Sequence, residues 1–437
     1  MPHGLRVQPL AGPLQGEAVL PGDKSISHRA FLLNTLGSGS ARLTSVNDGA
    51  DVRSTIACLR MLGTQIVEDG GGFRVEGRSG RLRCPASVLD CGNSGTTLRL
   101  LAGLLAAQSF TATLDGDASL RQRPMTRIAQ PLRRMGARVE GPDNGAHPPL
   151  VLTGSTLIAS EFELQIASAQ LKSCLLLAAV AGAVELRLRE PHRSRDHTER
   201  MLLAMGADLS QDDGWIRLRP TPALQCVDVD VPGDPSSLAL LSACLCALPG
   251  SQLRARRVLL NPTRAAFLDV LSGAGFTVVR EALSERAGES VGSVLLRSAA
   301  ELRAFDIGAD ELPALIDEIP ALAVVAAHAR GRSSVRGIRE LRVKESDRVA
   351  AIESLLRSFE VECGSDEDTL WIQGGLGRTP ERLDAGEDHR IVMAAVALSL
   401  SAATRERRQV ELADLRPADV SFPGFRAALG ALGVSVA

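Results

Sequence analysis

The sequence predicts an α/β fold with two similar domains, each built from three βαβαββ units. Three observations predict it: a recurring helix and β-hairpin, a recurring apolar helix, and a Pro-Gly-Asp sequence that occurs at two places. With 437 residues and 45% apolar content, the chain is long enough for two or three domains and can bury a large core.

The helix and β-hairpin pattern consists of a helix, a Gly stop and two short strands with a polar turn. Its copies are "CLRMLGTQIVEDGGGFRVEG", "PLRRMGARVEGPDNGAHPPLVLTG", "MLLAMGADLSQDDGWIRLRP", "VLSGAGFTVVREALSERAGESVGSVLLRS" and "LLRSFEVECGSDEDTLWIQGG". A sixth copy, "FRAALGALGVSVA", has only its first strand, and "HGLRVQPL" near the other end resembles a second strand. We therefore expect residues near Leu5–Pro9 to pair with residues near Val434–Ala437, so that the two termini close one domain.

The second repeated element is a polar start followed by a long apolar run of small residues. Its copies are "PGDKSISHRAFLLNTLGSG", "CGNSGTTLRLLAGLLAA", "ASAQLKSCLLLAAVAGA", "PGDPSSLALLSACLCALPG", "LPALIDEIPALAVVAAHARG" and "GEDHRIVMAAVALSLSA". Runs that are apolar on nearly every face are typical of buried helices. The chain therefore holds six units of about 70 residues, each with one buried helix.

The first and fourth units begin alike, with Pro21-Gly22-Asp23 and Pro232-Gly233-Asp234. Both Pro-Gly pairs form turns and are natural points for the chain to cross between domains. We expect one domain at residues 22–231 and the other at residues 1–21 and 232–437.

Composition and missing motifs exclude several classes of protein. A net charge of −2 gives no support to nucleic-acid binding. The eight cysteines are scattered without a C-x-x-C pair, as expected of free thiols in a reducing compartment. Without a signal-like start or an apolar run of membrane length, a cytoplasmic protein is expected. The sequence has no Walker A, H-E-x-x-H, G-x-S-x-G or strand-linked G-x-G-x-x-G motif.

Polar residues crowd the starts of all six predicted buried helices. For any one start the plain interpretation is capping, because Ser, Thr, Asp and Asn satisfy free N–H groups there. Capping does not call for Lys24, Arg29 or Arg390, since the helix dipole disfavours a cation at this end by up to about 1 kcal/mol. An anionic ligand would offset that cost, and a helix N-terminus is an anion site by geometry.

Further charged residues lie between the helices. Lys344 and Arg348 in "ELRVKESDR" share a helix face, with Glu345 three residues before Arg348. A solvated, salt-bridged face explains this segment equally well. Asp317 lies in the apolar stretch "ALIDEIPALA", where an unpaired charge would be costly, and a cap or a satisfied surface residue is its alternative. The other cations in such segments are Arg121, Arg123, Arg195 and Arg342.

Taken together, these segments resemble the 5-enolpyruvylshikimate-3-phosphate synthase family of the shikimate pathway. The motifs, in the family's order, are "PGDKSISHR", "GNSGTTLRL", "LRQRPM", "SAQLKS", "SRDHTERM", "VPGDPSS", "LIDEIP", "RVKESDR", "DHRIVMA" and "SFPGF". They cover essentially the whole chain, and ten in order are highly specific. The resemblance implies the two-domain inside-out α/β barrel of the enolpyruvyl transferase fold.

The resemblance also implies an activity and a set of site residues. The family transfers the carboxyvinyl group of phosphoenolpyruvate to the 5-hydroxyl of shikimate 3-phosphate and releases phosphate. Shikimate 3-phosphate would contact Lys24, Ser25, Arg29, Ser168, Ala169, Gln170, Arg195, Asp317 and Lys344. Phosphoenolpyruvate would contact Lys24, Gly95, Arg123, Gln170, Arg348 and Arg390. Asp317 would take the hydroxyl proton, Glu345 would protonate the methylene carbon, and Lys24 would touch both substrates.

The same resemblance implies that the reaction needs no metal or organic cofactor. The expected partners are the two small-molecule substrates, with no nucleic acid and no membrane, and a monomer is expected because one chain holds both domains. Val420, His197 and Glu340 depart from a Lys, a Tyr and an Asn that some members carry, as in the family's second bacterial sequence class. We expect these departures to alter affinity rather than the reaction. Gly95 stands where an Ala gives tolerance to the inhibitor glyphosate.

Two alternatives remain open from the sequence alone. The nearer is the enolpyruvyl transferase of this fold that acts on UDP-N-acetylglucosamine, whose first motif has Lys-Asn where this chain has Lys24-Ser25 and which uses a loop cysteine. The remoter is a non-catalytic repeat scaffold in which the charged residues are solvated.

Overall fold

The protein divides into two compact units in the computed structural model, which describes residues 5–221 and 223–435. Unit 1 comprises residues 1–21, 232–284 and 290–437, and unit 2 comprises residues 22–231 and 285–289. The chain therefore passes between the units beside both Pro-Gly pairs. Residues 285–289 are a difference from the expected domains, because the repeat placed them with unit 1.

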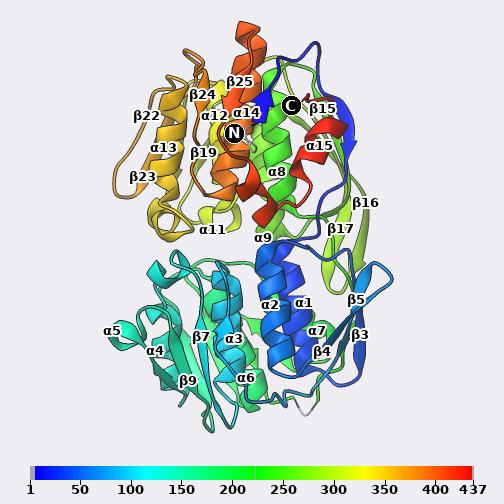
Figure 1. Ribbon diagram of the computed structural model, residues 1–437, viewed down its shortest axis with the longest axis vertical. Helices are drawn as coiled ribbons and strands as arrows, with labels where there is room; N and C mark the ends of the chain where they lie inside the picture. Colours follow the sequence, from blue (N-terminus) through cyan, green and yellow to red (C-terminus); the bar gives the residue numbers. More distant parts are fainter. Residues whose placement is uncertain (1–4, 222, 436–437) are drawn as a thin grey trace. The chain divides into compact units, whose positions relative to one another are not determined.

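Unit 2 has three buried helices at its centre, packed on one another (Figure 1). They are α1 (Lys24–Leu36), α3 (Gly95–Leu105) and α6 (Ala169–Gly182). Each is followed by an outer helix, namely α2 (Ala50–Met61), α4 (Thr126–Arg134) and α7 (His197–Ala204). Shorter helices are η1 (Leu120–Gln122) and α5 (Pro142–Gly145).

Three four-stranded sheets complete the described part of unit 2, and all share one topology. In each sheet, in spatial order, the first strand pairs parallel with the second, and the second–third and third–fourth pairings are antiparallel. The first sheet is β14 (Val229–Asp230), β3 (Ser40–Thr44), β5 (Gly72–Glu76) and β4 (Gln65–Asp69). The second is β6 (Leu89–Asp90), β7 (Thr111–Asp115), β9 (Leu150–Thr153) and β8 (Arg138–Glu140). The third is β10 (Ser160–Glu163), β11 (Leu186–Arg189), β13 (Trp215–Leu218) and β12 (Leu209–Asp212).

Unit 1 repeats the plan, and its buried helices also pack on one another. They are α8 (Pro235–Cys244), α12 (Ile319–His328) and α14 (His389–Glu406), and the outer helices are α10 (Phe267–Ala274), α13 (Arg348–Ser358) and α15 (Phe425–Ala431). Shorter helices are η2 (Leu245–Ala247), α9 (Pro262–Ala265), α11 (Leu312–Leu315), η3 (Ile338–Val343) and η4 (Arg416–Val420).

The sheets of unit 1 follow the same order, except that the last has three strands among the described residues. One sheet is β2 (Gln15–Ala18), β15 (Gln252–Leu259), β17 (Glu289–Arg297) and β16 (Thr277–Arg286). The next is β19 (Asp306–Ile307), β21 (Arg332–Arg336), β23 (Thr369–Gln373) and β22 (Cys363–Ser365). The last is β24 (Arg382–Leu383), β25 (Val410–Leu412) and β1 (Leu5–Val7), and β18 (Leu302–Arg303) pairs with β20 (Ala329–Arg330).

The N-terminal strand pairs with a strand that the repeat pattern did not name. β1 pairs antiparallel with β25, in register Leu5 with Leu412. It thus has the position that β23 has beside β21, and since β23 also pairs with β22 on its other side, this pairing does not conflict with the expected one. Of the expected partner Val434–Ala437, residues 436–437 lie outside the described residues and residues 434–435 form no strand, although the Gln8 amide donates to the Ser435 carbonyl at 3.4 Å.

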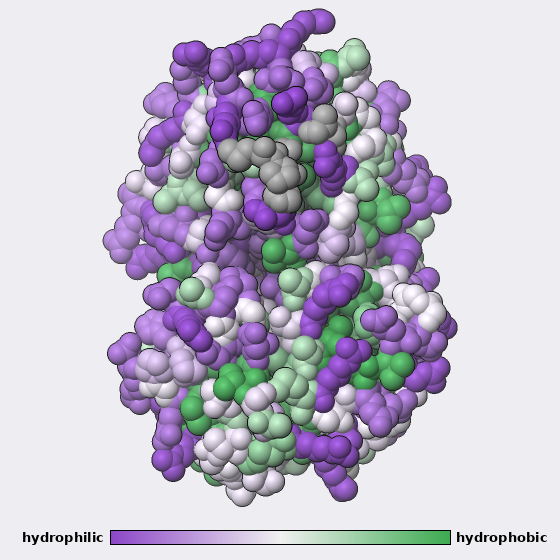
Figure 2. Space-filling model, viewed as in Figure 1, coloured by the Kyte–Doolittle hydropathy of each residue, from purple (hydrophilic) through white to green (hydrophobic). Residues whose placement is uncertain are grey.

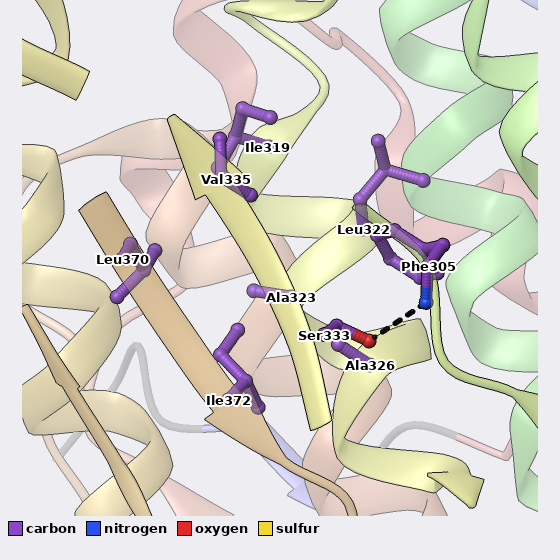
Figure 3. Close-up of a pocket in the computed structure, with 9 residues that line it drawn as sticks. All are labelled: Phe305, Ile319, Leu322, Ala323, Ala326, Ser333, Val335, Leu370 and Ile372. Carbon is purple, nitrogen blue, oxygen red and sulfur yellow. Dashed lines mark hydrogen bonds between the residues drawn. The ribbon is translucent and has the colours of Figure 1, made fainter. Parts of the chain in front are cut away.

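The helix α12 packs on its sheet through apolar side chains (Figure 3). Ile319, Leu322 and Ala323 on the helix meet Val335 on β21 and Leu370 on β23, and the cavity left among them is about 10 Å³. That volume is barely enough for one water molecule. The helix is therefore closely packed against this sheet.

On the face drawn in Figure 2, hydrophilic residues are widespread and hydrophobic residues gather in small groups. None of the described helices is long and apolar enough to cross a membrane.

The closure of unit 1 by β1 generates a stability prediction. Leu5 is 1% exposed, and its truncation to Ala should lower the free energy of unfolding of unit 1 by about 2–5 kcal/mol, because it leaves a cavity in the hydrophobic core of that unit. Arg6→Ala, on the exposed side of the same strand, should change it by less than about 0.5 kcal/mol. Urea denaturation with hydrogen exchange of β25 measures both, and equal effects of the two variants would contradict a closing role for β1.

Candidate active site

Five of the six buried helices begin with a side chain that caps the N-terminus. The capping residues are Asp23, Ser94, Ser168, Asp234 and Asp388, each accepting a hydrogen bond from an N–H of the first turn. At the sixth helix, α12, Glu318 holds this position and makes no capping bond. Capping is therefore satisfied without the cations of these segments, which need another explanation.

Arg29 joins three helices within unit 2. It lies on α1 and is 3% exposed. Its Nε donates to the hydroxyl of Thr198 on α7 at 2.8 Å, and Nη2 donates to the hydroxyl of Ser173 on α6 at 2.8 Å. Its Nη1 donates to the backbone oxygen of Ser25 at 3.0 Å. These three hydrogen bonds hold the Arg29 guanidinium in one orientation.

Lys24 and His28 connect α1 to α2 and to the start of α3. Lys24 Nζ lies 2.9 Å from Oδ2 of Asp51. The His28 ring is fully buried, with Nδ1 2.7 Å from the Thr55 hydroxyl, which lies 2.7 Å from the Thr97 hydroxyl. Burial lowers the pKa of His28 to about 3, against the opposing attraction of Asp51. The ring is therefore neutral near pH 7.

The start of α3 brings two predicted phosphoenolpyruvate contacts beside Gly95. Gln170 accepts a bond from Arg99 Nη1 at 2.5 Å and donates to the Thr96 hydroxyl at 2.9 Å. A Cβ atom at position 95 would lie 2.9 Å from Arg99 Nη1 and 3.2 Å from Arg123 Nη1. Glycine thus lets two guanidinium groups approach the backbone at the positive end of α3, where an anion is favoured.

Ser168 and Ala169 form the start of α6, immediately before Gln170. One turn further on, the buried Lys172 Nζ lies 2.7 Å from Glu190 and 2.8 Å from Glu199. Burial would lower the pKa of Lys172, but the two carboxylates outweigh it and raise that pKa. Lys172 thereby ties α6 to the segment 190–199, on which the half-buried Arg195 lies.

The predicted acid and base lie together in unit 1, around one buried arginine. Arg348 Nη1 is 3.0 Å from Oδ1 of Asp317, and Nη2 is 2.6 Å from Oε2 of Glu345. Lys344 Nζ is 3.9 Å from Asp317 Oδ1, and Arg390 Nη2 is 3.6 Å from Asp317 Oδ2. Five residues chosen from sequence motifs thus form one cluster.

The sequence motifs missed Asp388, which is a third carboxylate on the same arginine. Its Oδ2 accepts a bond from Arg348 Nε at 3.0 Å and one from the Ser346 hydroxyl at 2.9 Å. Burial alone would lower the pKa of Arg348, but Asp388, Glu345 and Asp317 outweigh it and raise that pKa. Burial would likewise raise the pKa of Asp388, yet the attraction of Arg348 lowers it. Both groups are therefore charged near pH 7.

Other residues of these clusters carried only weak sequence signals. Asp388 immediately precedes "HR" in "DHRIVMA" and reads as a cap, which it also is. Asp51, Arg99 and Thr198 occur within helical segments, where a charged or hydroxyl residue is ordinary. Nothing in their spacing shows that they meet Lys24, Gln170 and Arg29, respectively.

The chain matches one protein family over nearly its full length. A sequence model of the family described as EPSP synthase (3-phosphoshikimate 1-carboxyvinyltransferase) matches residues 10–429. A 3-phosphoshikimate 1-carboxyvinyltransferase of Alkaliphilus metalliredigens is 42% identical over 420 residues, covering 96% of this chain and 97% of the relative. One of Herpetosiphon aurantiacus is 45% identical over 416 residues, covering 94% and 95%.

Solved structures of enolpyruvyl transferases are also similar to this chain. An EPSP synthase from Acinetobacter baumannii superposes with a TM-score of 0.87 at 32% identity, covering 100% of this chain and 99% of that one. The enolpyruvyl transferase NikO from Streptomyces tendae superposes with a TM-score of 0.78 at 17% identity, covering 100% and 98%, and shows the fold alone. The predicted fold class, a two-domain inside-out α/β barrel, is confirmed.

The buried, neutral His28 generates a prediction on pH and stability. Its pKa is lower in the folded protein than the value of about 6.5 in an unfolded chain. The unfolded state therefore binds more protons below pH 6.5, so the contribution of His28 to the stability of unit 2 is fully present above that pH and is lost as pH falls toward 3. The loss from this group should be about 1.4 kcal/mol per pH unit.

The measurement is urea denaturation of unit 2 between pH 7 and pH 4. His28→Gln, which does not titrate, should show a shallower loss than the unsubstituted protein. His192→Gln, at an exposed histidine, is the control and should keep the original slope. An unchanged slope in His28→Gln would show that His28 does not make this contribution.

Proposed function

The chain belongs to the EPSP synthase family, the 3-phosphoshikimate 1-carboxyvinyltransferases, and from that premise we propose how its residues divide the reaction. Enzymes of this family transfer the carboxyvinyl group of phosphoenolpyruvate to the 5-hydroxyl of shikimate 3-phosphate in the shikimate pathway, which leads to the aromatic amino acids. The observation that carries the assignment of roles is the cluster of Asp317 and Glu345 around the buried Arg348.

We propose that unit 2 supplies most of the binding of shikimate 3-phosphate. Lys24, Ser25 and Arg29 would hold the carboxylate, and the segments of α6 and α7 would hold the phosphate and ring. The residues assigned to the phosphate and ring are Ser168, Ala169, Gln170 and Arg195, with Lys344 from unit 1. The support is local: Lys24, Ser25, Ser168, Ala169 and Gln170 lie at the starts of the buried helices α1 and α6, where free N–H groups and the dipole favour an anion.

We propose that phosphoenolpyruvate is bound by Gly95, Arg123 and Gln170 of unit 2 together with Lys24, and by Arg348 and Arg390 of unit 1. Arginine suits this task because its planar fork binds phosphate and carboxylate through paired hydrogen bonds. The charges are also of opposite sign and similar size. Two phosphates of about −1.5 to −2 each and two carboxylates would bring a charge of about −5 to −6 to a site with seven candidate cations. These are Lys24, Arg29, Arg123, Arg195, Lys344, Arg348 and Arg390.

The chemistry then needs one base and one acid. Asp317 would take the proton of the 5-hydroxyl as that oxygen bonds to C2 of phosphoenolpyruvate, while Glu345 would deliver a proton to C3. The tetrahedral intermediate then loses phosphate and a proton from the new methyl group, which restores the carbon–carbon double bond. Positioning and charge stabilisation carry this reaction, with Lys24 able to contact both substrates.

We further propose that the enzyme acts as a monomer in the cytoplasm. One chain supplies every residue assigned to the two substrates. All eight cysteines are free thiols, which suits a reducing compartment.

The choice of acceptor can be tested directly by phosphate release. With phosphoenolpyruvate and shikimate 3-phosphate the purified protein should release phosphate at a rate of enzymatic turnover, and with UDP-N-acetylglucosamine in place of shikimate 3-phosphate it should release none above background. Release with the sugar nucleotide would favour the other enolpyruvyl transferase, and release with neither acceptor would favour a scaffold.

The acid and base roles predict that Asp317→Asn and Glu345→Gln each lower kcat by about 10²- to 10⁴-fold, because each removes a proton carrier. Both substitutions preserve shape, so the denaturation midpoint should stay close to that of the unsubstituted protein. Glu367→Gln, at an exposed carboxylate that pairs with Arg339, is the matched control and should keep full activity. A near-normal kcat in Asp317→Asn or Glu345→Gln would refute the role of that residue.

A further inference from the structure

Glu318 stands directly after Asp317 and is an exception among the starts of the buried helices. It holds the N-cap position of α12, yet its side chain makes no capping bond. It is a carboxylate only 1% exposed, in a place where the other buried helices have a short capping side chain. A charge buried to that degree costs several kcal/mol unless it is paired, so its partners indicate its purpose.

The partners of Glu318 come from the start of α8 and from the short helix α9. The Ser236 hydroxyl donates to Glu318 Oε1 in a short hydrogen bond, and Arg264 Nη2 lies 3.9 Å from the same oxygen. Arg264 Nη2 also donates to Ser236 Oγ at 3.0 Å and lies 3.1 Å from Asp234 Oδ1. Arg264, Asp234 and Ser236 are each less than 5% exposed, so this is a buried cluster that lies within unit 1.

The two neighbouring carboxylates therefore bind different sets of partners. Asp317 contacts Arg348, Lys344 and Arg390, whereas Glu318 contacts Arg264 and Ser236. The backbone between them is also held, because the Asp317 carbonyl accepts a bond from Arg390 Nη1 at 3.1 Å and the Glu318 amide donates to the Leu315 carbonyl at 2.8 Å. The turn that carries Asp317 is thus held by Arg390 on one side and by the cluster around Glu318 on the other.

We infer that Glu318, held by Arg264 and Ser236, is a positioning residue that fixes the Asp317 carboxylate in the geometry needed for proton transfer. This inference rests on the proposed role of Asp317 as the base. A buried ion pair is weak evidence for a stabilising role, because apolar residues of similar volume are often equally stable, so the approach of Glu318 to Arg264 is better explained by orientation than by stability. A displacement of about 1 Å at a reacting group can cost about 100-fold in rate.

The first variant is Glu318→Gln, which keeps the shape and the acceptor for Ser236 but removes the charge that faces Arg264. It should lower kcat by at least about tenfold and change KM for either substrate by less than about twofold. A purely structural role would lower the denaturation midpoint without this difference between a reduced kcat and an unchanged KM. Glu353→Gln, which removes a carboxylate paired with Arg357 on α13, is the matched control and should leave kcat unchanged.

The second variant is Glu318→Leu, which removes the carboxylate and leaves Arg264 paired with Asp234 and Ser236. The denaturation midpoint should stay close to that of the unsubstituted protein, because the buried Asp234 keeps its cation, and kcat should still be reduced at least about tenfold. A kcat within twofold of the unsubstituted protein, in this variant or in Glu318→Gln, overturns the inference. If Glu318→Leu does not fold, the split between kcat and KM in Glu318→Gln decides alone.

The third measurement asks whether Glu318 acts through Asp317. If it does, the double variant Asp317→Asn/Glu318→Gln should be no slower than Asp317→Asn. If the fold-losses in kcat of the two single variants instead multiplied in the double variant, the two residues would act independently and the inference would be overturned. The same set separates the two proposals: near-normal activity of Asp317→Asn refutes the base itself, whereas an inactive Asp317→Asn with a normal Glu318→Gln refutes only the positioning role.

Discussion

A charge buried in a protein must have partners, and this constraint controls how the starts of the helices are arranged in both units. Arg29 and Arg348 are 3% and 1% exposed. Each is bonded to side chains from other segments of its own unit, so each serves as a cross-link between helices. A cation needed to bind an anion is therefore also a cation that orients the elements around it. Under the proposed assignment, substrate binding and local structure would therefore depend on the same few arginines.

The two arginines differ in the kind of partner that holds them. Arg29 donates to the Ser173 and Thr198 hydroxyls and to a backbone carbonyl, acceptors that orient the guanidinium without cancelling its charge. Arg348 instead binds the carboxylates of Glu345, Asp317 and Asp388. The first arrangement suits the binding of an anionic substrate. The second gathers three carboxylates, two of them the proposed base and acid, and the positive charge of Arg348 keeps these acidic groups close together at a tolerable cost.

Sequence reasoning succeeded where a feature is local and repeats. The buried helices are apolar on every face, and their caps are single residues at fixed positions, so both could be predicted from the chain. Pairings between distant segments could not. The contacts of Arg264 with Glu318 and of Lys172 with Glu199 join residues with no shared motif. The pairing of β1 with β25 was not predicted for a related reason, because a three-residue strand has too little pattern to determine every neighbour with which it pairs.

His197 shows how a departure from the family pattern can be absorbed by the fold. It stands where some relatives have a Tyr, but its side chain is fully buried and its Nδ1 lies 2.7 Å from Oε1 of Glu289. Arg200 donates to the Gly288 carbonyl at 2.7 Å, so α7 holds the segment 285–289 at two points. His197 therefore stabilises the start of α7, from which Thr198 reaches Arg29. Its influence on shikimate 3-phosphate would be exerted through the orientation of Arg29, which agrees with an effect on affinity rather than on the reaction.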